Sequence, residues 1–183
     1  MTIPTSENGW VSIFDPCPDE ILEKAWQIMQ TNRYCSLSTC SPDGLPWVSP
    51  VLFCHQNLNL YWSSAIASRH SQNLYQNEGR IAIAIYDSQA KKGTAKGLYF
   101  SGIATEVPPE KVRETMNLLF RKAGGNPPNR TEADYLGESP CRMYGFQPKE
   151  AWVTGDRLPM GDRLIDTKIQ LKLEDMLDFL DHN

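Results

Sequence analysis

Apolar and polar positions recur along this chain with periods that define its expected elements. Leu58, Leu60 and Trp62 alternate with polar neighbours, which is the period of a strand. Between Arg80 and Tyr86, isoleucines form one face and alanines the other. The same reasoning predicts further strands over residues 34–39, 45–53, 98–107, 142–146 and 150–154. Six or so short strands with few, separated helices predict a mainly β fold with flanking helices, a small antiparallel β-barrel.

Helical spacing marks four other segments. One follows Pro16-Cys17-Pro18, one runs from Arg69 to about Asn77 behind Ser68, and one begins at Pro109 and ends at Gly124-Gly125. The last carries Leu173, Met176, Leu177 and Leu180 on one face. We expect a single domain over residues 1–183, with a core of about 18–155. Residues 156–183 form a tail that packs on the barrel or on a partner subunit, and Gly155 to Asp162 reads as a turn-rich loop.

Composition narrows the classes of function. The 183 residues carry a net charge of −4, which predicts no broad basic surface and disfavours nucleic acid as a partner. No apolar run is long enough for a membrane span, and the polar start at 1–8 is unlike a signal peptide, so we expect a cytoplasmic protein without membrane association. The five cysteines include no C-x-x-C pair, and they are expected to be reduced thiols that pack as small apolar residues. His55, His70 and His182 are scattered, so the sequence indicates no metal site.

The stretch from Trp62 to His70 closes a strand and opens a helix. Ser63, Ser64 and Ser68 stand there beside Arg69, and Ser68 occupies the N-cap position. Hydroxyls, a guanidinium and free amides at a helix N-terminus suit a phosphate, because the amides and the helix dipole favour an anion. The alternative is a capped helix with a surface arginine.

The order of the motifs before and after this stretch favours the phosphate-site interpretation over the alternative. An Asp-Gly-x-Pro turn, a strand, Ser-Ser-x-x-x-Ser-Arg-His, Asn-Leu-x-x-Asn and Arg-Ile-Ala-Ile-Ala follow one another. Over roughly residues 30 to 155 this string resembles the pyridoxamine 5'-phosphate oxidase-like family of FMN-binding split barrels. The resemblance implies a split β-barrel, FMN as cofactor, and a homodimer with FMN at the subunit interface.

The resemblance also implies roles for individual residues. Ser63 and Ser64 match the strand end that meets the FMN phosphate, with Ser68 at the start of the next helix. Arg69 and His70 match the family's Arg-Lys pair, with histidine in place of lysine. The strand that runs beside the isoalloxazine ring is matched by residues 48–53, within which the cofactor-binding set comprises Ser49, Pro50, Val51 and Leu52. Trp152 matches a tryptophan near the cofactor, with a plain core aromatic as the alternative, and Arg163 completes the set.

Departures from the family pattern limit the substrate that can be inferred. Ser49 replaces the arginine that begins the flavin strand, and Cys54 replaces the lysine that ends it. The family's Arg-Leu-His-Asp-Arg stretch corresponds to residues 163–167 here, where Ile165 replaces the histidine and Thr167 the second arginine. We therefore expect a flavoprotein, an oxidoreductase whose small-molecule substrate differs from pyridoxine phosphate, and no residue is assigned as catalytic. The alternatives are a non-enzymatic flavin-binding or redox-sensing module, and a split barrel that holds haem or a deazaflavin.

Overall fold

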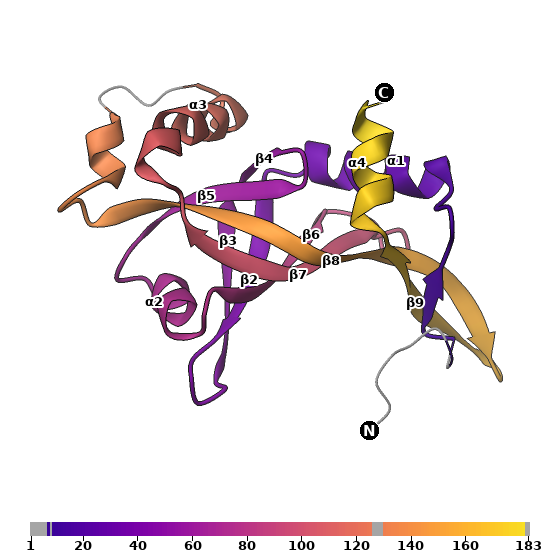
Figure 1. Ribbon diagram of the computed structural model, residues 1–183. Coiled ribbons are helices and arrows are strands. Elements are labelled where there is room, and N and C mark those ends of the chain that lie inside the picture. Colours follow the sequence, from indigo (N-terminus) through magenta and orange to yellow (C-terminus); the bar gives the residue numbers. More distant parts are fainter. Residues whose placement is uncertain (1–6, 8, 126–129, 182–183) are drawn as a thin grey trace. The chain divides into compact units, whose positions relative to one another are not determined.

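The computed structural model describes residues 7, 9–125 and 130–181 (Figure 1). Its strands and helices follow one another along the chain in this order: β1 (Val11–Ile13), α1 (Asp19–Thr31), β2 (Tyr34–Cys40), β3 (Pro46–Leu52), β4 (Cys54–Gln56), β5 (Asn59–Ala65), α2 (Arg69–Gln76), β6 (Arg80–Tyr86), β7 (Gly97–Glu106), the 3-10 turn η1 (Pro109–Lys111), α3 (Val112–Ala123), the 3-10 turn η2 (Glu132–Tyr135), β8 (Cys141–Met160), β9 (Arg163–Leu171) and α4 (Leu173–Asp181). The prediction of a mainly β fold with flanking helices is confirmed. His182 and residues 1–6, 8 and 126–129 lie outside the described residues.

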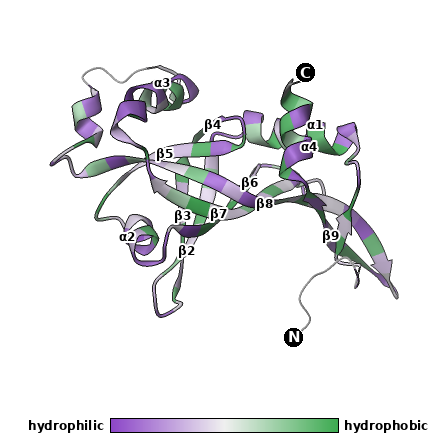
Figure 2. Ribbon diagram, in the orientation of Figure 1, coloured by the Kyte–Doolittle hydropathy of each residue, from purple (hydrophilic) through white to green (hydrophobic). Residues whose placement is uncertain are grey.

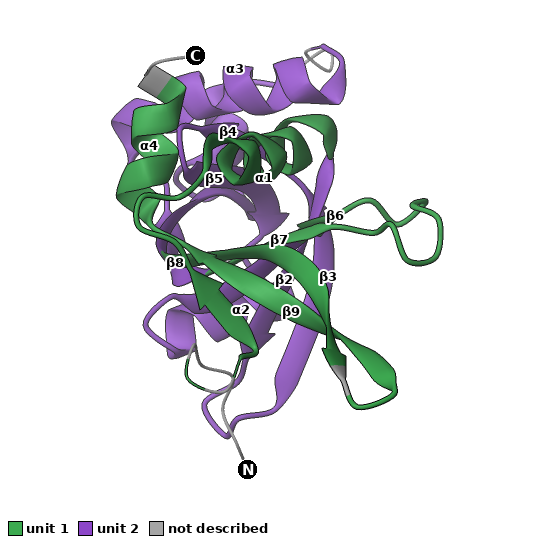
Figure 3. Cartoon of the chain, turned by 90° about the vertical axis from the view of Figure 1, so that its right-hand side faces the viewer, with its two compact units in different colours: residues 1–32, 85–100, 150–183 green, residues 33–84, 101–149 purple. Residues whose placement is uncertain are grey.

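Contacts divide the chain into two compact units (Figure 3). The first unit comprises residues 1–32, 85–100 and 150–183, and the second comprises residues 33–84 and 101–149. Strands β6, β7 and β8 each contribute residues to both units. The single domain expected from the sequence stays a prediction.

The first unit joins two helices to a strand hairpin. In β1, residues 11–13 pair in parallel with residues 168–170 of β9, and β9 pairs antiparallel with β8. Helices α1 and α4 interleave apolar with polar positions (Figure 2) and pack together, and the indole nitrogen of Trp26 donates to the Met176 carbonyl at 3.2 Å. Met176 is fully buried, so α4 packs within its own unit, while the expected packing of the tail on the barrel or on a partner subunit stays a prediction.

The second unit holds most of the predicted strands. β2 pairs antiparallel with β3 and β6, while β5 pairs with β4 and β8. The three isoleucines of β6 are buried, as its alternation predicts. Helix α3 covers β4 and β5 and contributes to a core of eight buried residues: Cys54, Val107, Val112, Met116, Leu119, Phe120, Tyr135 and Met143.

Two glycines occupy positions that other residues would strain. A Cβ on Gly102 would lie 2.2 Å from the Gln147 carbonyl oxygen, so glycine allows a close backbone approach there. Gly124 ends α3 with a φ of 101°, the left-handed conformation that glycine adopts without strain.

The prediction of a loop from Gly155 to Asp162 is wrong. Residues 155–160 continue β8, and β9 returns along them as a strand that sequence reasoning missed. A register shift between Thr154 and Arg157 marks a bulge, where a Cβ on Gly155 would come within 2.5 Å of the Thr167 hydroxyl. The side chains of this hairpin are mostly polar and exposed. The sequence therefore lacks the apolar alternation by which a strand is recognised. The parallel β1–β9 pair likewise corrects the wholly antiparallel sheet that was expected.

The thiols behave as predicted. All five cysteines are free, and Cys17, Cys35 and Cys54 are buried. Burial raises the pKa of Cys35 and of Cys54 to about 12, so both thiols are protonated at neutral pH and unreactive.

Candidate functional site

Three serine hydroxyls of the second unit gather around the ring of His70. The His70 Nε2 atom lies 2.7 Å from the Ser64 hydroxyl and 3.1 Å from that of Ser68, while Nδ1 lies 3.1 Å from the hydroxyl of Ser49. These residues come from the end of β5, the start of α2 and the middle of β3. The structure therefore brings together four of the residues that the sequence predicted to bind a cofactor.

Helix α2 begins as its sequence predicts. Ser68 has extended backbone angles, and its hydroxyl accepts from the Ser71 amide at 3.4 Å, the N-cap contact. The Gln72 amide donates to the Ser68 carbonyl at 3.0 Å. Within the described residues, no acceptor is recorded for the amides of Arg69 and His70. Those two N–H groups and the positive end of the helix dipole remain for an anion.

The ring of His70 is buried and neutral. Burial lowers its pKa below the ordinary 6.5, so the imidazole is uncharged at physiological pH. The Trp47 indole donates to the Ser49 hydroxyl at 2.8 Å, which leaves the Ser49 proton for Nδ1 of His70. The ring is then protonated on Nε2 and donates toward Ser64 and Ser68. Because the Ser64 oxygen accepts this proton, its own hydrogen is left to donate to a ligand.

We refer to the set of Ser49, Ser64, Ser68, Arg69 and His70 as the Arg69 corner. Arg69 supplies the positive charge of this corner. It is exposed at the first position of α2, and its guanidinium carbon lies 4.8 Å from the centre of the Trp47 ring. No ion pair to Arg69 occurs in the part of the chain that the structure describes. Since the aromatic face orients the guanidinium without neutralising it, its donors remain available to a phosphate.

Ser63 is the exception in the cluster. Successive side chains of a strand point to opposite faces, so Ser63 points away from the face that carries Ser64, and it lies beside the Tyr135 side chain. The three-way convergence of Ser63, Ser64 and Ser68 that the sequence suggested is therefore restricted to Ser64 and Ser68, with Ser49 as the third hydroxyl.

The strand that was predicted to run beside the flavin ring, β3, is the last strand of the sheet order, next to β2. Its residues 46–52 pair with β2 along one edge. Ser49, Val51 and Leu52 are partly buried, whereas Pro50 is exposed. Proline has no amide hydrogen, so Pro50 can offer a ligand only its carbonyl.

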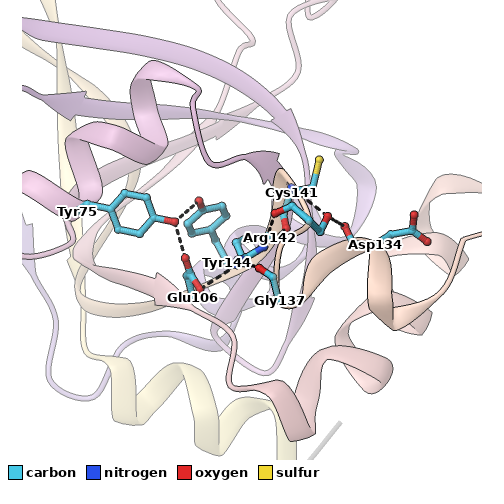
Figure 4. Close-up of polar contacts among 8 residues, drawn as sticks. Tyr75, Glu106, Asp134, Gly137, Cys141, Arg142 and Tyr144 are labelled. Carbon is cyan, nitrogen blue, oxygen red and sulfur yellow. Dashed lines mark hydrogen bonds and ion pairs between the residues drawn. The ribbon is translucent and has the colours of Figure 1, made fainter.

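A network of polar contacts supports the turn between β5 and α2 (Figure 4). Arg142 donates to the carbonyls of Gly137 and Ser139 at 2.5 and 2.7 Å and pairs with Glu106 at 3.3 Å. The next carbonyl, that of Pro140, accepts from the Ile66 amide at 2.8 Å. Arg142 thus fixes the segment against which the serine-bearing turn rests.

On the far side of Glu106, two tyrosines continue the same network. The hydroxyls of Tyr75 and Tyr144 lie 2.8 Å apart, and Tyr75 also donates to Glu106 (Figure 4). The Tyr144 ring stacks on the ring of Trp62, the residue before Ser63, with 5.8 Å between the ring centroids. These contacts hold β5 in place up to the point where its serines begin.

The remaining predicted site residues belong to the first unit. Trp152 is partly buried on β8 opposite Gln170, and Arg163 is exposed at the start of β9 opposite Met160. The serine cluster lies wholly in the second unit, and the cofactor roles of Trp152 and Arg163 stay predictions.

Two residues that sequence reasoning missed contribute to the corner. Trp47 contacts both Arg69 and Ser49, and Tyr135 lies beside Ser63. Trp47 and Ser49 are two apart on one strand, so their shared face was available as a signal. The contact from Tyr135 joins segments some 70 positions apart, and no local pattern announces it.

Comparison with known families decides the chain's affiliation. The profile described as pyridoxamine 5'-phosphate oxidase matches residues 21–151. The chain belongs to the pyridoxamine 5'-phosphate oxidase family. The resemblance inferred from the sequence is confirmed, and the fold is the split barrel of this family. No curated protein matches the chain.

Solved structures share the fold at low sequence identity. A haem-binding protein from Mycobacterium smegmatis is 16% identical at a TM-score of 0.62, over 86% of this chain and 60% of its own. HutZ, described as a haem storage protein of Vibrio cholerae, is 16% identical at a TM-score of 0.53, over 69% of this chain and 89% of its own. A Bacteroides thetaiotaomicron protein provisionally described as a 5-nitroimidazole antibiotic resistance protein is 13% identical at a TM-score of 0.59, over 72% of this chain and 81% of its own.

Within the described residues, histidines, cysteines and carboxylates form no group of three that could hold a metal ion. No described helix has the length and apolar character needed to cross a bilayer. The cytoplasmic location stays a prediction.

Proposed function

We propose that this member of the family binds FMN through the serine and arginine corner of its second unit and acts as an FMN-dependent oxidoreductase. The observation that carries the proposal is the arrangement around His70. The Ser64 hydroxyl, a guanidinium without an ion-pair partner among the described residues and two helix N-terminal amides present donors suited to a phosphate group, whereas the Ser68 hydroxyl donates to that of Ser71 at 2.9 Å.

Each residue has a distinct part in holding the phosphate. Arg69 provides the charge, Ser64 provides a hydroxyl, and Ser68 caps the helix whose first amides face the anion. His70, where the resemblance implies lysine, orients the Ser64 hydroxyl instead of adding a second charge. FMN bound there would supply hydride chemistry, while the protein contributes binding, orientation and electrostatics.

The spectrum of the purified protein tests the proposal. We expect the absorption bands of oxidised flavin, either as isolated or after addition of FMN and desalting. Anaerobic bleaching of those bands by NADH or NADPH, followed by turnover with an electron acceptor, would support an oxidoreductase. A flavin that is retained but never reduced would favour the non-enzymatic module.

Haem is the second candidate, because two proteins with this fold are described as haem proteins. In this chain both ring nitrogens of His70 face serine hydroxyls, and the Nδ1 atom of His55 faces the Asn57 carbonyl at 3.2 Å. His70, with both nitrogens engaged, is thereby disfavoured as an iron ligand, whereas the Nδ1 contact of His55 with a carbonyl is one that metal-ligating histidines commonly make. A haem band in place of flavin bands in the same spectrum would reverse this preference.

We further propose a homodimer, on the strength of exposed apolar side chains in the second unit. Leu45, Trp47 and Val48 are 52, 39 and 59% exposed. Adjacent exposed apolar side chains of this size are typical of interaction surfaces. Sedimentation should show a dimer at micromolar concentration and a monomer for Val48→Glu. A wild-type monomer would contradict the proposal.

A further inference from the structure

Glu106, the last residue of β7, joins helix α2 to strand β8 (Figure 4). One of its carboxylate oxygens, Oε1, accepts from the hydroxyl of Tyr75, which lies in the last turn of α2. The other oxygen, Oε2, lies 3.3 Å from Nε of Arg142 on β8. The Tyr144 hydroxyl completes the cluster at 2.8 Å from that of Tyr75. A single side chain of β7 therefore bonds both the end of the helix and a residue of the neighbouring strand.

Arg142 reaches the other end of α2 along two routes. It lies directly opposite Ser64 in the antiparallel pairing of β5 with β8. Directly opposed residues share one face of the sheet with about 4.5–5.5 Å between their Cβ atoms, so Arg142 and Ser64 are neighbours. The Arg142 guanidinium also donates to carbonyls within residues 137–139, and the next carbonyl, that of Pro140, accepts from the Ile66 amide at 2.8 Å. Both routes end at the turn that carries the donors of the Arg69 corner.

The position of Arg142 depends on Glu106. The Arg142 side chain is 17% exposed, and its donors reach three backbone carbonyls besides the Glu106 carboxylate. A charged group taken out of water is costly unless an opposite charge and hydrogen bonds compensate it, so loss of the carboxylate charge would disturb this arrangement. Because the same carboxylate accepts from Tyr75, a change at Glu106 reaches both ends of α2.

We propose that Glu106, Arg142 and Tyr75 are positioning residues, which set the affinity of the Arg69 corner for a phosphate group by fixing both ends of α2. This role rests on the FMN function proposed above and extends it to residues outside the corner. It concerns the phosphate and not the flavin ring, because the junction that they hold carries the Ser64 hydroxyl and the first amides of α2. By linkage, a bound phosphate stabilises the same contacts in return.

Titration of the apoprotein with FMN and with riboflavin tests this role. Glu106→Gln keeps an oxygen that can accept from Tyr75 and removes the charge that faces Arg142, while Tyr75→Phe removes only a hydroxyl. Each variant should weaken FMN binding about tenfold, within the range by which residues that do not touch a ligand alter its affinity, and should leave riboflavin affinity unchanged. Glu110→Gln is the matched control and should bind FMN like the wild type, because Glu110 is an exposed glutamate of the second unit without an ion pair among the described residues.

Hydrogen exchange of the apoprotein decides the positional claim without a cofactor. In both variants the Ile66 amide and the amides at the start of α2 should exchange faster than in the wild type. The amides of β6 should exchange as in the wild type, which shows that the variants are folded. The proposal is overturned if both variants match the wild type in either measurement, or if FMN and riboflavin affinities fall together. A wild type that binds no FMN would refute the FMN function instead, and the exchange rates would still decide whether these residues position the corner.

Discussion

Arg69→Ala should remove most FMN binding while leaving the fold intact. The side chain is exposed, and its recorded contact is the Trp47 ring at 4.8 Å. A cation–π contact at an exposed site contributes about 0.5–1 kcal/mol, so the free energy of unfolding should fall by no more than that. The helix start is unaffected, because Ser68 provides the N-cap.

The effect on FMN is much larger. A guanidinium can donate two hydrogen bonds to a phosphate, and each bond to a charged group contributes about 1.5–3 kcal/mol. Losing both removes at least about 3 kcal/mol, which lowers the affinity by about two orders of magnitude or more.

The assay is quenching of FMN fluorescence during titration with apoprotein, paired with urea unfolding. Arg80→Ala is the matched control, because Arg80 is also an exposed arginine of the second unit and pairs only with exposed Glu78 among the described residues. The control should bind FMN like the wild type. An unchanged dissociation constant in Arg69→Ala, with normal folding, would refute the assignment of the corner.

Three further outcomes follow from the same geometry. Ser68→Ala should lower the free energy of unfolding by about 1 kcal/mol through loss of the N-cap, with a smaller loss of FMN affinity than Arg69→Ala; wild-type urea curves would contradict this. Because burial depresses the pKa of His70 in the folded state, the unfolded chain binds more protons below pH 6.5. Stability should therefore fall as pH drops from 7.5 to 5.5, and less steeply in His70→Gln, whereas parallel unfolding profiles for the two proteins would exclude this origin. FMN-loaded protein should oxidise pyridoxine 5'-phosphate slowly or not at all, because Ile165 offers no polar side-chain contact and the Thr167 hydroxyl donates to the Asp156 carbonyl at 2.6 Å. Formation of pyridoxal 5'-phosphate at about one turnover per second, measured by absorbance, would show that another residue restores the substrate contacts.

Local patterns in the sequence sufficed for the elements that frame the corner. The alternation in β5 and β6, the N-cap Ser68 and the glycines after α3 each act over a few residues, so a short window contains their signal. The split barrel followed from the order of those elements together with the family resemblance.

Features that depend on distant partners could not be predicted in this way. The hairpin of β8 and β9 is bulged at Gly155 and has a mostly polar exterior, so its composition is that of a loop. The role of His70 depends on Ser49, 21 positions earlier, and on the depth at which the ring is buried.

The most direct test of the account compares FMN with riboflavin, which carries the same ring without the phosphate. In the proposed site, Arg69, Ser64 and the amides at the start of α2 bind the phosphate and not the ring. Fluorescence titration of the apoprotein should therefore give an affinity for FMN about two orders of magnitude or more above that for riboflavin. Equal affinity for the two flavins, or no binding of either, would contradict the central claim.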